Sequence, residues 1–440
     1  MLDATAWPRV RRLFRWLEQF HDCFHHRAQT LALRRYIQGV LGDSTRKSME
    51  AMHARITDPG HYQALQHFIT HAVWDVAPVW QRLRRALPTR RGVLIIDDTG
   101  WPKQGTHSVG VARQYCGALG KVANCQVAVT TMLWAEQRAW PLGMTLYLPK
   151  DWTRDAARRT RAGIPPTVHF QEKWRLALTL LRRARAAQIA LTAVVADAGF
   201  GDVTVFREAL HRLQLPYALG VSSQLTVFLG TPRVVVPDAT RGRGRPPSRL
   251  TLLDDVTPIA LARVAADLPA RAWRRITWRN GTHHPWEAEF AALRVTPAQA
   301  WRKRRLASEV WLLCQRPCGG DTVLKYFFVH LPTTAALKTL VTLAHQRWAI
   351  EQQYQDLKDE LGFDHFEGRS YDGWQHHAVL TAVAYTFLQR ERAYRGPGAP
   401  LTFPMVRGLV RETFTALLFA SKPAYLTWMI RAQRLLPLRI

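Results

Sequence analysis

Residues 92–105 read GVLIIDDTGWPKQG, and this stretch contains the decisive pattern of the sequence. Five residues typical of a buried strand, Gly92 to Ile96, run directly into two adjacent acids, Asp97 and Asp98. Carboxylates are rarely buried unless they are paired or bound to a metal. The stretch therefore predicts a core strand that delivers carboxylates into a functional site.

A second apolar strand, at 190–202, has the same property, because its apolar run ends on Asp197. The predicted elements between and after the two acids follow a definite order: strands at 92–96, 123–135 and 139–149, a helix at 169–188, the strand at 190–202, a helix at 204–213 and a strand at 217–223. This order predicts an α/β fold with a ribonuclease-H-like mixed sheet, since a helical crossover makes the strands that it joins parallel.

The two acidic strand ends are expected to meet. Ligands of open α/β sheets collect at the carboxyl ends of parallel strands, so Asp97 or Asp98 should lie near Asp197. Two carboxylates at that distance repel each other, and a divalent cation removes the conflict. Hard oxygen ligands favour Mg²⁺, and two such ions can hold the attacking and leaving oxygens of a phosphodiester.

The rest of the chain divides by pattern into four regions. Residues 1–88 have helical spacing, 89–223 form the first part of the catalytic core, 224–332 are rich in strands and include a predicted hairpin at Asn280-Gly281, and 333–440 return to long helices. For the basic helices of 1–88 two interpretations stay open, a DNA-binding domain and a helical cap whose arginines are solvated.

Composition indicates the partner. The 440 residues have a net charge of +28, which points to a polyanion. The longest apolar run, AVLTAVAYTFL, is too short to span a bilayer, and the first residues lack the apolar region of a signal peptide. Nucleic acid is therefore the expected partner, no membrane is expected, and the predicted location is the cytoplasm in association with the nucleoid. The five scattered cysteines fit reduced thiols.

The helix predicted at 333–361 supplies a third acid. Arg347, Glu351 and Lys358 lie within about 40° of one another on one helical face. Such a face can combine a metal ligand with two phosphate contacts, but helical pattern alone favours a solvated face of salt bridges.

These motifs resemble the bacterial insertion-sequence transposases of the DDE class, in the group with a β-strand insertion before the final Glu. The final motif of that group is Tyr, two residues, Arg, three residues, Glu, six residues and Lys, which Arg347, Glu351 and Lys358 match. DDTG with its following Lys and ADAGFGD are similar to the first and second acid motifs. SVGVARQYCGALGKVANCQVAV and HFEGRS are similar to flanking blocks of the family.

The resemblance implies a cut-and-paste DNA transposase, a metal-dependent endonuclease and strand transferase. Asp97, Asp197 and Glu351 would be the catalytic residues and would hold two Mg²⁺ ions, for which Mn²⁺ can substitute, while Arg347 and Lys358 would hold phosphates. The implied substrates are double-stranded DNA at terminal inverted repeats and at a target. A homodimer in the synaptic complex and a hairpin at the excised ends are also implied.

Strand periodicity does not show which of the two adjacent acids, Asp97 or Asp98, is the first metal ligand. Asp97 shares a strand face with Ile95 and Asp98 with Ile96, and both faces are apolar. The family's first motif, an acid followed after one residue by Thr, indicates Asp97. Asp98 would then cap the turn expected at Thr99-Gly100, or position Lys103.

Further basic and aromatic residues are candidates for DNA contacts. Lys103 and Arg113 follow the first acid and are expected to hold phosphates. The segment RGRGRPPSR at 241–249 contributes Arg241, Arg243 and Arg245. Two interpretations apply to it, insertion into a narrow minor groove and a non-specific grip on phosphates, and the second is favoured. Three tryptophans of the insertion could stack on a flipped base, although packing is the expected role of at least two: Trp273, Trp278 and Trp286.

One position departs from the family pattern, because Ala344 stands where the final motif has Tyr. Tyr354 is a candidate replacement, about 60° from Glu351 around the helix. Ala344 supports a second hypothesis, a decayed or domesticated DNA-binding protein without catalysis. A third is a structure-selective nuclease with the same core, which would cut without requiring particular end sequences.

Overall fold

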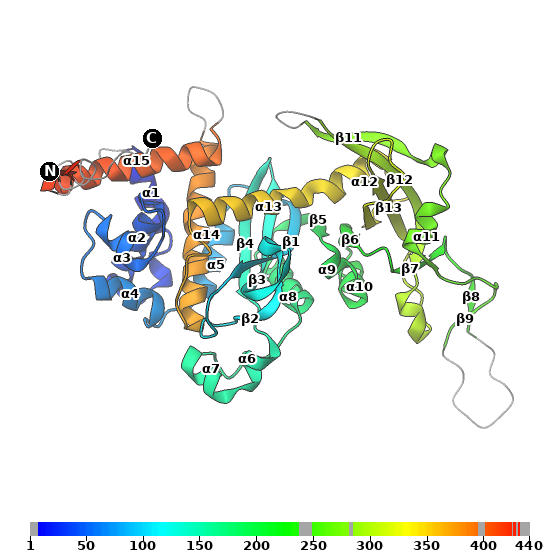
Figure 1. Cartoon of the computed structure of the whole chain (residues 1–440), viewed down its shortest axis with the longest axis horizontal. Coiled ribbons are helices and arrows are strands. Elements are labelled where there is room, and N and C mark those ends of the chain that lie inside the picture. Colours follow the sequence, from blue (N-terminus) through cyan, green and yellow to red (C-terminus); the bar gives the residue numbers. More distant parts are fainter. Residues whose placement is uncertain are drawn as a thin grey trace.

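The computed structural model of the chain describes residues 8–236, 249–280, 285–394, 401–424, 426–427 and 430–431. Figure 1 shows a helical part that contains the first and last described helices, a central sheet with helices on its faces, and a β-rich part at the opposite end of the molecule. A long helical stretch that includes α12 (Leu337–Ala344) and α13 (Trp348–Gln355) runs across the central sheet toward the β-rich part. No helix in the described ranges is long and apolar enough to cross a membrane.

The central sheet has the strand order β4-β3-β1-β5-β6. The first three strands pair antiparallel, and β5 and β6 run parallel to β1. This order and these directions are those of a ribonuclease-H-like sheet, so the predicted fold class is confirmed. The strand bounds are β1 (Arg91–Pro102), β3 (Lys121–Ala135), β4 (Arg138–Leu146), β5 (Ala190–Ala196) and β6 (Tyr217–Val221).

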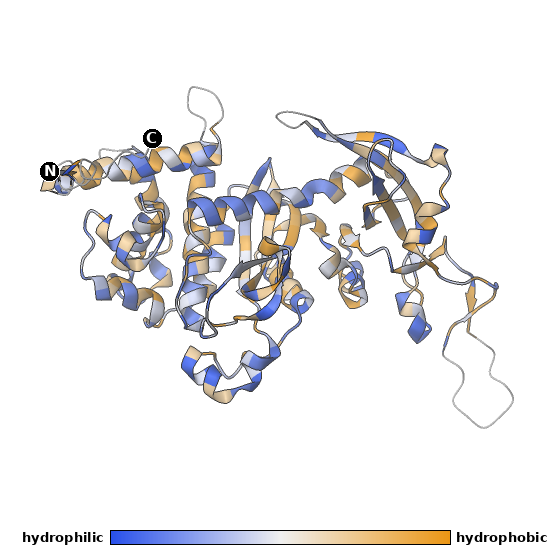
Figure 2. Ribbon diagram, viewed as in Figure 1, coloured by the Kyte–Doolittle hydropathy of each residue, from blue (hydrophilic) through white to orange (hydrophobic). Residues whose placement is uncertain are grey.

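Helices cover both faces of this sheet, which is why its strands are apolar on both sides. Leu94 and Ile96 of β1 pack in the core that contains α8 (Lys173–Ala186) and α10 (Thr204–Arg212). Ile95 packs on the other side, in the core that contains α12 (Leu337–Ala344) and α13 (Trp348–Gln355). In Figure 2 the central strands are predominantly coloured as apolar. The alternation along β1 therefore decides which helix each following side chain faces.

Short elements that sequence patterns did not predict complete the core. An edge strand, β2 (Ala112–Cys116), pairs with the first residues of β3 through a short 3₁₀ turn at Gly117–Leu119. Between β4 and α8 lie α6 (Lys150–Arg154) and α7 (Ala156–Ala162), and α9 (Ala198–Gly201) follows β5. These segments are too short to give a periodic signal of their own.

The β-rich insertion extends the central sheet. Its last strand, β14, pairs antiparallel with β6, so the described residues contain one continuous sheet of 12 strands. The predicted hairpin is confirmed by the antiparallel pairing of β11 and β12, with 281–284 outside the described residues. The insertion contains β7 (Thr226–Leu229), β8 (Val234–Val235), β9 (Thr251–Leu252), β10 (Ile259–Ala260), α11 (Leu261–Ala266), β11 (Arg274–Asn280), β12 (Pro285–Pro297), β13 (Val310–Arg316) and β14 (Lys325–His330).

The helices of the two chain ends share one core. Trp16 donates its indole N–H to the carbonyl of Val383 at 3.1 Å, and the Tyr36 hydroxyl lies 2.7 Å from Nδ1 of His377. The N-terminal helices therefore pack on the C-terminal helices, and both interpretations of their basic residues stay open. The elements are α1 (Pro8–Glu18), α2 (Arg27–Leu41), α3 (Met49–Ala54), α4 (Tyr62–Thr70), α5 (Val76–Arg85), α14 (Tyr371–Ala393) and α15 (Phe403–Ser421).

Candidate active site

Asp97 lies on β1, and Asp197 directly follows the neighbouring parallel strand β5 at the matching position. The register of β1 and β5 pairs Ile95 with Val195, and each acid follows two residues later. Because side chains alternate along a strand, both acids are on the face of Ile95 and Val195, which α12 and α13 cover. The sequence predicted that the strand ends at the acids. This prediction is wrong, because β1 continues to Pro102. It is the parallel pairing with β5 that ends before the acids.

The Asp97 carboxylate is buried, with 6% of the residue exposed. Burial raises its pKa to about 8, the nearby Asp197 and Asp98 act in the same direction, and the charge of Arg347 opposes them. Its Oδ1 accepts the backbone N–H of Asp98 at 2.9 Å, and its Oδ2 accepts Nη1 of Arg347 at 2.6 Å. The carboxylate is thus held in place by a cation in an acidic surrounding.

Asp197 is positioned by a close approach of backbone segments. A Cβ on Gly201 would lie 1.8 Å from the carbonyl oxygen of Gly220, so only glycine allows α9 to pack against β6 there. Oδ1 of Asp197 is buried and has no hydrogen-bond partner within the described structure. Burial raises the pKa of this carboxyl, Asp98 raises it further, and the amides of Phe200 and Gly199 counteract in part.

Arg347 lies between two of the predicted acids. Its guanidinium donates to Asp97 through Nη1 and to Glu351 through Nη2. Glu351 and Asp97 are therefore connected through the guanidinium of Arg347, which donates to both carboxylates. Among the described residues no group of three or more His, Cys, Asp or Glu side chains is arranged to hold a metal ion. The structure thus brings together Asp97, Asp197 and Arg347, with Glu351 on the outer side of the guanidinium.

The helix that carries these residues is not a uniform α-helix. A 3₁₀ turn at His345–Arg347 precedes α13, and a π-helical turn at Asp356–Glu360 follows it. The π turn changes the helical phase, so angles counted for an ideal α-helix do not apply to Lys358. Its Nζ donates to the carbonyl of Gly100 at 3.3 Å, which places Lys358 beside β1, three residues beyond Asp97.

Asp98 faces the opposite side of the sheet. Its Oδ2 accepts Nζ of Lys173, the first residue of α8, at 2.8 Å. The two roles expected for Asp98 are wrong. There is no turn to cap at Thr99-Gly100, because β1 continues through both residues. Lys103 is not its partner, because Nζ of Lys103 donates to the carbonyls of Asp364 and Phe366. Sequence reasoning missed Lys173, whose only signal was its place at the start of a basic helix.

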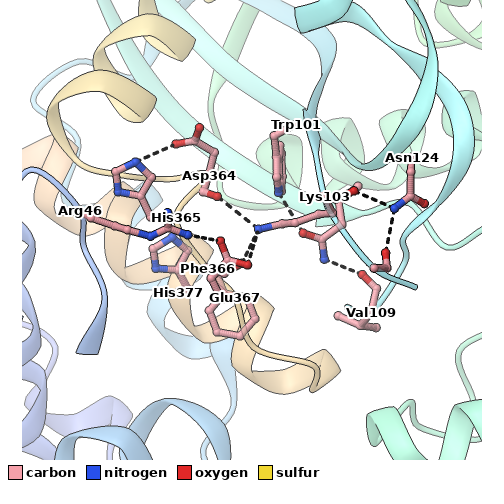
Figure 3. A network of polar contacts seen from close by, with 12 residues as sticks. Arg46, Trp101, Lys103, Val109, Asn124, Asp364, His365, Phe366, Glu367 and His377 are labelled. Atoms are coloured by element: carbon pink, nitrogen blue, oxygen red, sulfur yellow. Dashed lines mark hydrogen bonds and ion pairs between the residues drawn. The ribbon is translucent and has the colours of Figure 1, made fainter. Parts of the chain in front are cut away.

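Lys103 was expected to hold a phosphate, and this expectation is corrected by its surroundings (Figure 3). The residue is 9% exposed, and its Nζ donates to the carbonyls of Phe366 at 2.7 Å and Asp364 at 3.4 Å. Glu367 lies at 3.6 Å and is also bound by Arg46. The ammonium joins the end of β1 to the segment before α14 and is occupied by protein carbonyls, which argues against a phosphate contact.

This fastening gives a testable expectation for stability. Lys103→Met keeps the length of the side chain but leaves the Phe366 carbonyl without its charged donor, which is expected to cost about 2 kcal/mol of unfolding free energy. Lys338→Met, at an exposed lysine, is the matched control and should change stability little. Urea unfolding followed by tryptophan fluorescence measures both variants. Equal stability of the two would contradict a fastening role.

The structure describes some of the other residues that the sequence proposed for DNA contacts or for the place of the motif Tyr. Tyr354 is buried, with its hydroxyl 2.5 Å from Oγ1 of Thr130, so it does not present that hydroxyl outward in place of the motif Tyr. Ala344 is buried in α12. Trp273 and Trp278 pack within the protein, as expected for two of the three tryptophans, and Trp286 is 56% exposed. The other candidates lie outside the described residues: Arg241, Arg243 and Arg245.

Comparison with known proteins adds independent information. Residues 19–285 match the model of a family described as DDE superfamily endonuclease, a range that includes Asp97 and Asp197 and ends before Glu351. A curated protein of Microchaete diplosiphon, named "Probable transposase for insertion sequence element IS701", is 28% identical over 223 residues. The match covers 50% of this chain and 56% of that protein, so the chain spans about half the length of this curated relative.

Among solved structures, a piggyBac transposase synaptic complex with hairpin DNA aligns with a TM-score of 0.42 and 9% identity, over 99% of this chain and 84% of that chain. The family model matches well over half of the chain and includes both acids that the sheet places side by side. The chain therefore belongs to the DDE superfamily of endonucleases.

Proposed function

We propose that this protein is a DDE transposase that cuts DNA strands at the terminal inverted repeats of an insertion sequence and transfers the freed ends to a target. The observation that carries the proposal is the side-by-side placement of Asp97 and Asp197 on parallel strands, with Arg347 bound to the first of them. Membership in the endonuclease family and a net charge of +28 support it.

The residues fit divalent cations of the Mg²⁺ type. Asp97 and Asp197 offer hard oxygen ligands, and the buried Oδ1 of Asp197 has no partner in the described structure. Asp197 and Asp98 raise the pKa of Asp97, and Asp98 raises the pKa of Asp197, so positive charge is favoured beside these carboxylates. Two Mg²⁺ ions, or Mn²⁺ in their place, would supply an activated water and stabilise the charge on the leaving oxygen.

Arg347 and Glu351 would act together in this site. In the structure the guanidinium is occupied by two carboxylates. A DNA phosphate offers the same forked acceptor geometry, so substrate would compete for Arg347 and release Glu351 to join Asp97 and Asp197 as a third ligand. Lys358, held beside β1 at Gly100, would contact the next phosphate along the strand.

The proposed partners are double-stranded DNA carrying the inverted repeats, a target duplex, and a second copy of the chain in the synaptic complex, with the nucleoid of the cytoplasm as the place of action. The test is excision from a plasmid that carries the DNA flanking the gene, with Mg²⁺ present and then chelated. Cleavage at matched repeats only with Mg²⁺ is the expected result. Cleavage that ignores the repeat sequence would instead favour a structure-selective nuclease.

One observation favours a second candidate, a DNA-binding protein that has lost catalysis. Ala344 replaces the motif Tyr, and Tyr354 does not take its place, since its buried hydroxyl is bonded to Thr130. In this case the plasmid would be bound with the same affinity with or without Mg²⁺, and no strand would be cut under either condition.

The positive charge leads to a prediction about salt. Binding that neutralises several phosphates releases counterions, so affinity should fall by about a thousandfold or more between about 50 mM and about 200 mM salt. Fluorescence anisotropy with a labelled duplex measures this slope. Replacing Arg241, Arg243 and Arg245 with alanine should lower the slope if that segment grips phosphates. A flat salt dependence of the unmodified protein would reject nucleic acid as its main partner.

A further inference from the structure

The hairpin formed by β2 and β3 presents apolar side chains to solvent. Tyr115 is 61% exposed, Leu119 is 44% exposed and Val122 is 52% exposed. Tyr115 and Val122 are directly opposite each other in the antiparallel pair, so they share one face. The opposite face is packed, with Cys116 and Cys125 buried. Two large apolar residues exposed on one face of a folded hairpin, with a third exposed in its turn, indicate a binding surface.

The two glycines of the hairpin turn face open space. A Cβ built on Gly117 or on Gly120 would meet no other atom within 4 Å. β2 is the last strand of the sheet on this side, and in the described residues it pairs only with β3. We call the exposed surface formed by Tyr115, Leu119 and Val122 the hairpin tip.

The charge around the hairpin tip is positive. From Thr99 to Ala135 the sequence contains no Asp or Glu. Arg113 is exposed beside Tyr115 on β2, and Lys121 is exposed at the start of β3. This combination of apolar and cationic side chains is complementary to DNA, where cations meet phosphates and apolar groups meet base faces.

The hairpin begins beside the candidate active site. A Cβ on Gly100 would lie 3.5 Å from Sγ of Cys116, and the carbonyl of the same glycine accepts Nζ of Lys358. A DNA strand whose phosphate contacted Lys358 would therefore pass close to β2. The hairpin block was also part of the sequence resemblance, yet no step of the proposed reaction uses it.

We propose that the hairpin tip is a DNA-binding element that packs Tyr115 and Leu119 against bases next to the cleaved phosphate, while Arg113 and Lys121 hold the flanking backbone. The proposal rests on the transposase function above and adds to it an element that opens the base stack. Proteins that bend or open DNA commonly insert apolar side chains between base steps in this manner.

The test uses the full chain and a duplex with a single-stranded overhang that carries a fluorescent adenine analogue as its first unpaired base. Tyr115→Ala should weaken binding about tenfold, the size expected for loss of one base stack, and should remove the fluorescence change that reports base unstacking. Tyr115→Phe keeps the ring and should behave as the unmodified protein. Leu119→Ala should reduce the fluorescence change.

Two controls separate the contributions. Val73→Ala removes an apolar side chain that is 90% exposed in the helical part and should alter neither affinity nor fluorescence. Arg113→Ala and Lys121→Ala should each lower the salt slope by about one, whereas Tyr115→Ala should leave that slope unchanged.

The outcomes distinguish this inference from the proposed function. If the unmodified chain binds and cuts DNA but Tyr115→Ala and Leu119→Ala are silent, the role of the hairpin tip is wrong and the transposase function stands. If these variants instead dissociate a dimer in sedimentation without affecting DNA affinity, the surface binds a second copy and the inference is wrong. If the unmodified chain fails to bind DNA, both proposals fall.

Discussion

Asp97→Ala should eliminate metal-dependent DNA cleavage, whereas Asp98→Ala should leave a measurable fraction of it. This result is expected because Asp97 faces α13, where it binds Arg347 at 2.6 Å and lies beside Asp197. Asp98 points to the other face, where it pairs with Lys173. Its loss changes the local charge but removes no group from the proposed ligand set. Cleavage of a labelled inverted-repeat duplex in Mg²⁺ measures both variants.

A metal-rescue experiment makes the assignment sharper. Asp97→Cys should regain cleavage in Mn²⁺ relative to Mg²⁺, because a thiolate suits the softer ion better. Thermal melting followed by circular dichroism serves as the control for folding, since Asp97 is buried and an unfolded variant would also be inactive. Rescue by Asp98→Cys together with its absence in Asp97→Cys would reverse the assignment of the first ligand and leave the metal mechanism intact.

The second large effect is expected at Glu351. Glu351→Gln should lower Mg²⁺-dependent cleavage by about a thousandfold or more, as loss of a group that acts within a catalytic unit typically does. DNA affinity should stay within a few fold, because the change removes a negative charge that contacts Arg347 and no phosphate contact. Asp359→Asn, at an exposed acid on the following π turn, is the matched control.

The structure makes this experiment informative because Glu351 contacts Asp97 only through Arg347. If Glu351 is needed only to hold the arginine, glutamine can still accept the guanidinium N–H, and cleavage should persist. Normal cleavage by Glu351→Gln would therefore remove the residue from the ligand set. Asp356 and Glu360 would then become the acids to test on the same helix.

Local patterns in the sequence were sufficient for much of the fold. The apolar runs that became β1, β3, β4, β5 and β6 follow one another in the predicted order, and the hairpin of β11 and β12 was expected from its Asn-Gly turn. These features are encoded by neighbouring residues, since strand alternation, crossover helices and turn residues act over short stretches of chain. The acids at 97 and 197 follow from the same runs.

Long-range packing decided the rest. Both faces of β1 are apolar, so only the helices that cover them distinguish Asp97 from Asp98. In the sequence Lys103 has no recognisable partner, whereas in the fold the segment at 364–367 supplies the carbonyl and carboxylate that it contacts. The pairing of β14 with β6 joins the insertion to the core sheet, and no local pattern records an edge-to-edge pairing of strands more than a hundred residues apart.

The sequence by itself thus determined the order of strands and helices and the identity of the acids at their ends. The tertiary structure decided which of those acids face each other and which cations are already occupied. The physical reason is that hydrophobic periodicity reports whether a side chain is buried, whereas its partners depend on segments that are distant in the chain. Arg347 illustrates the difference, because its spacing to Glu351 is local and its bond to Asp97 spans 250 residues.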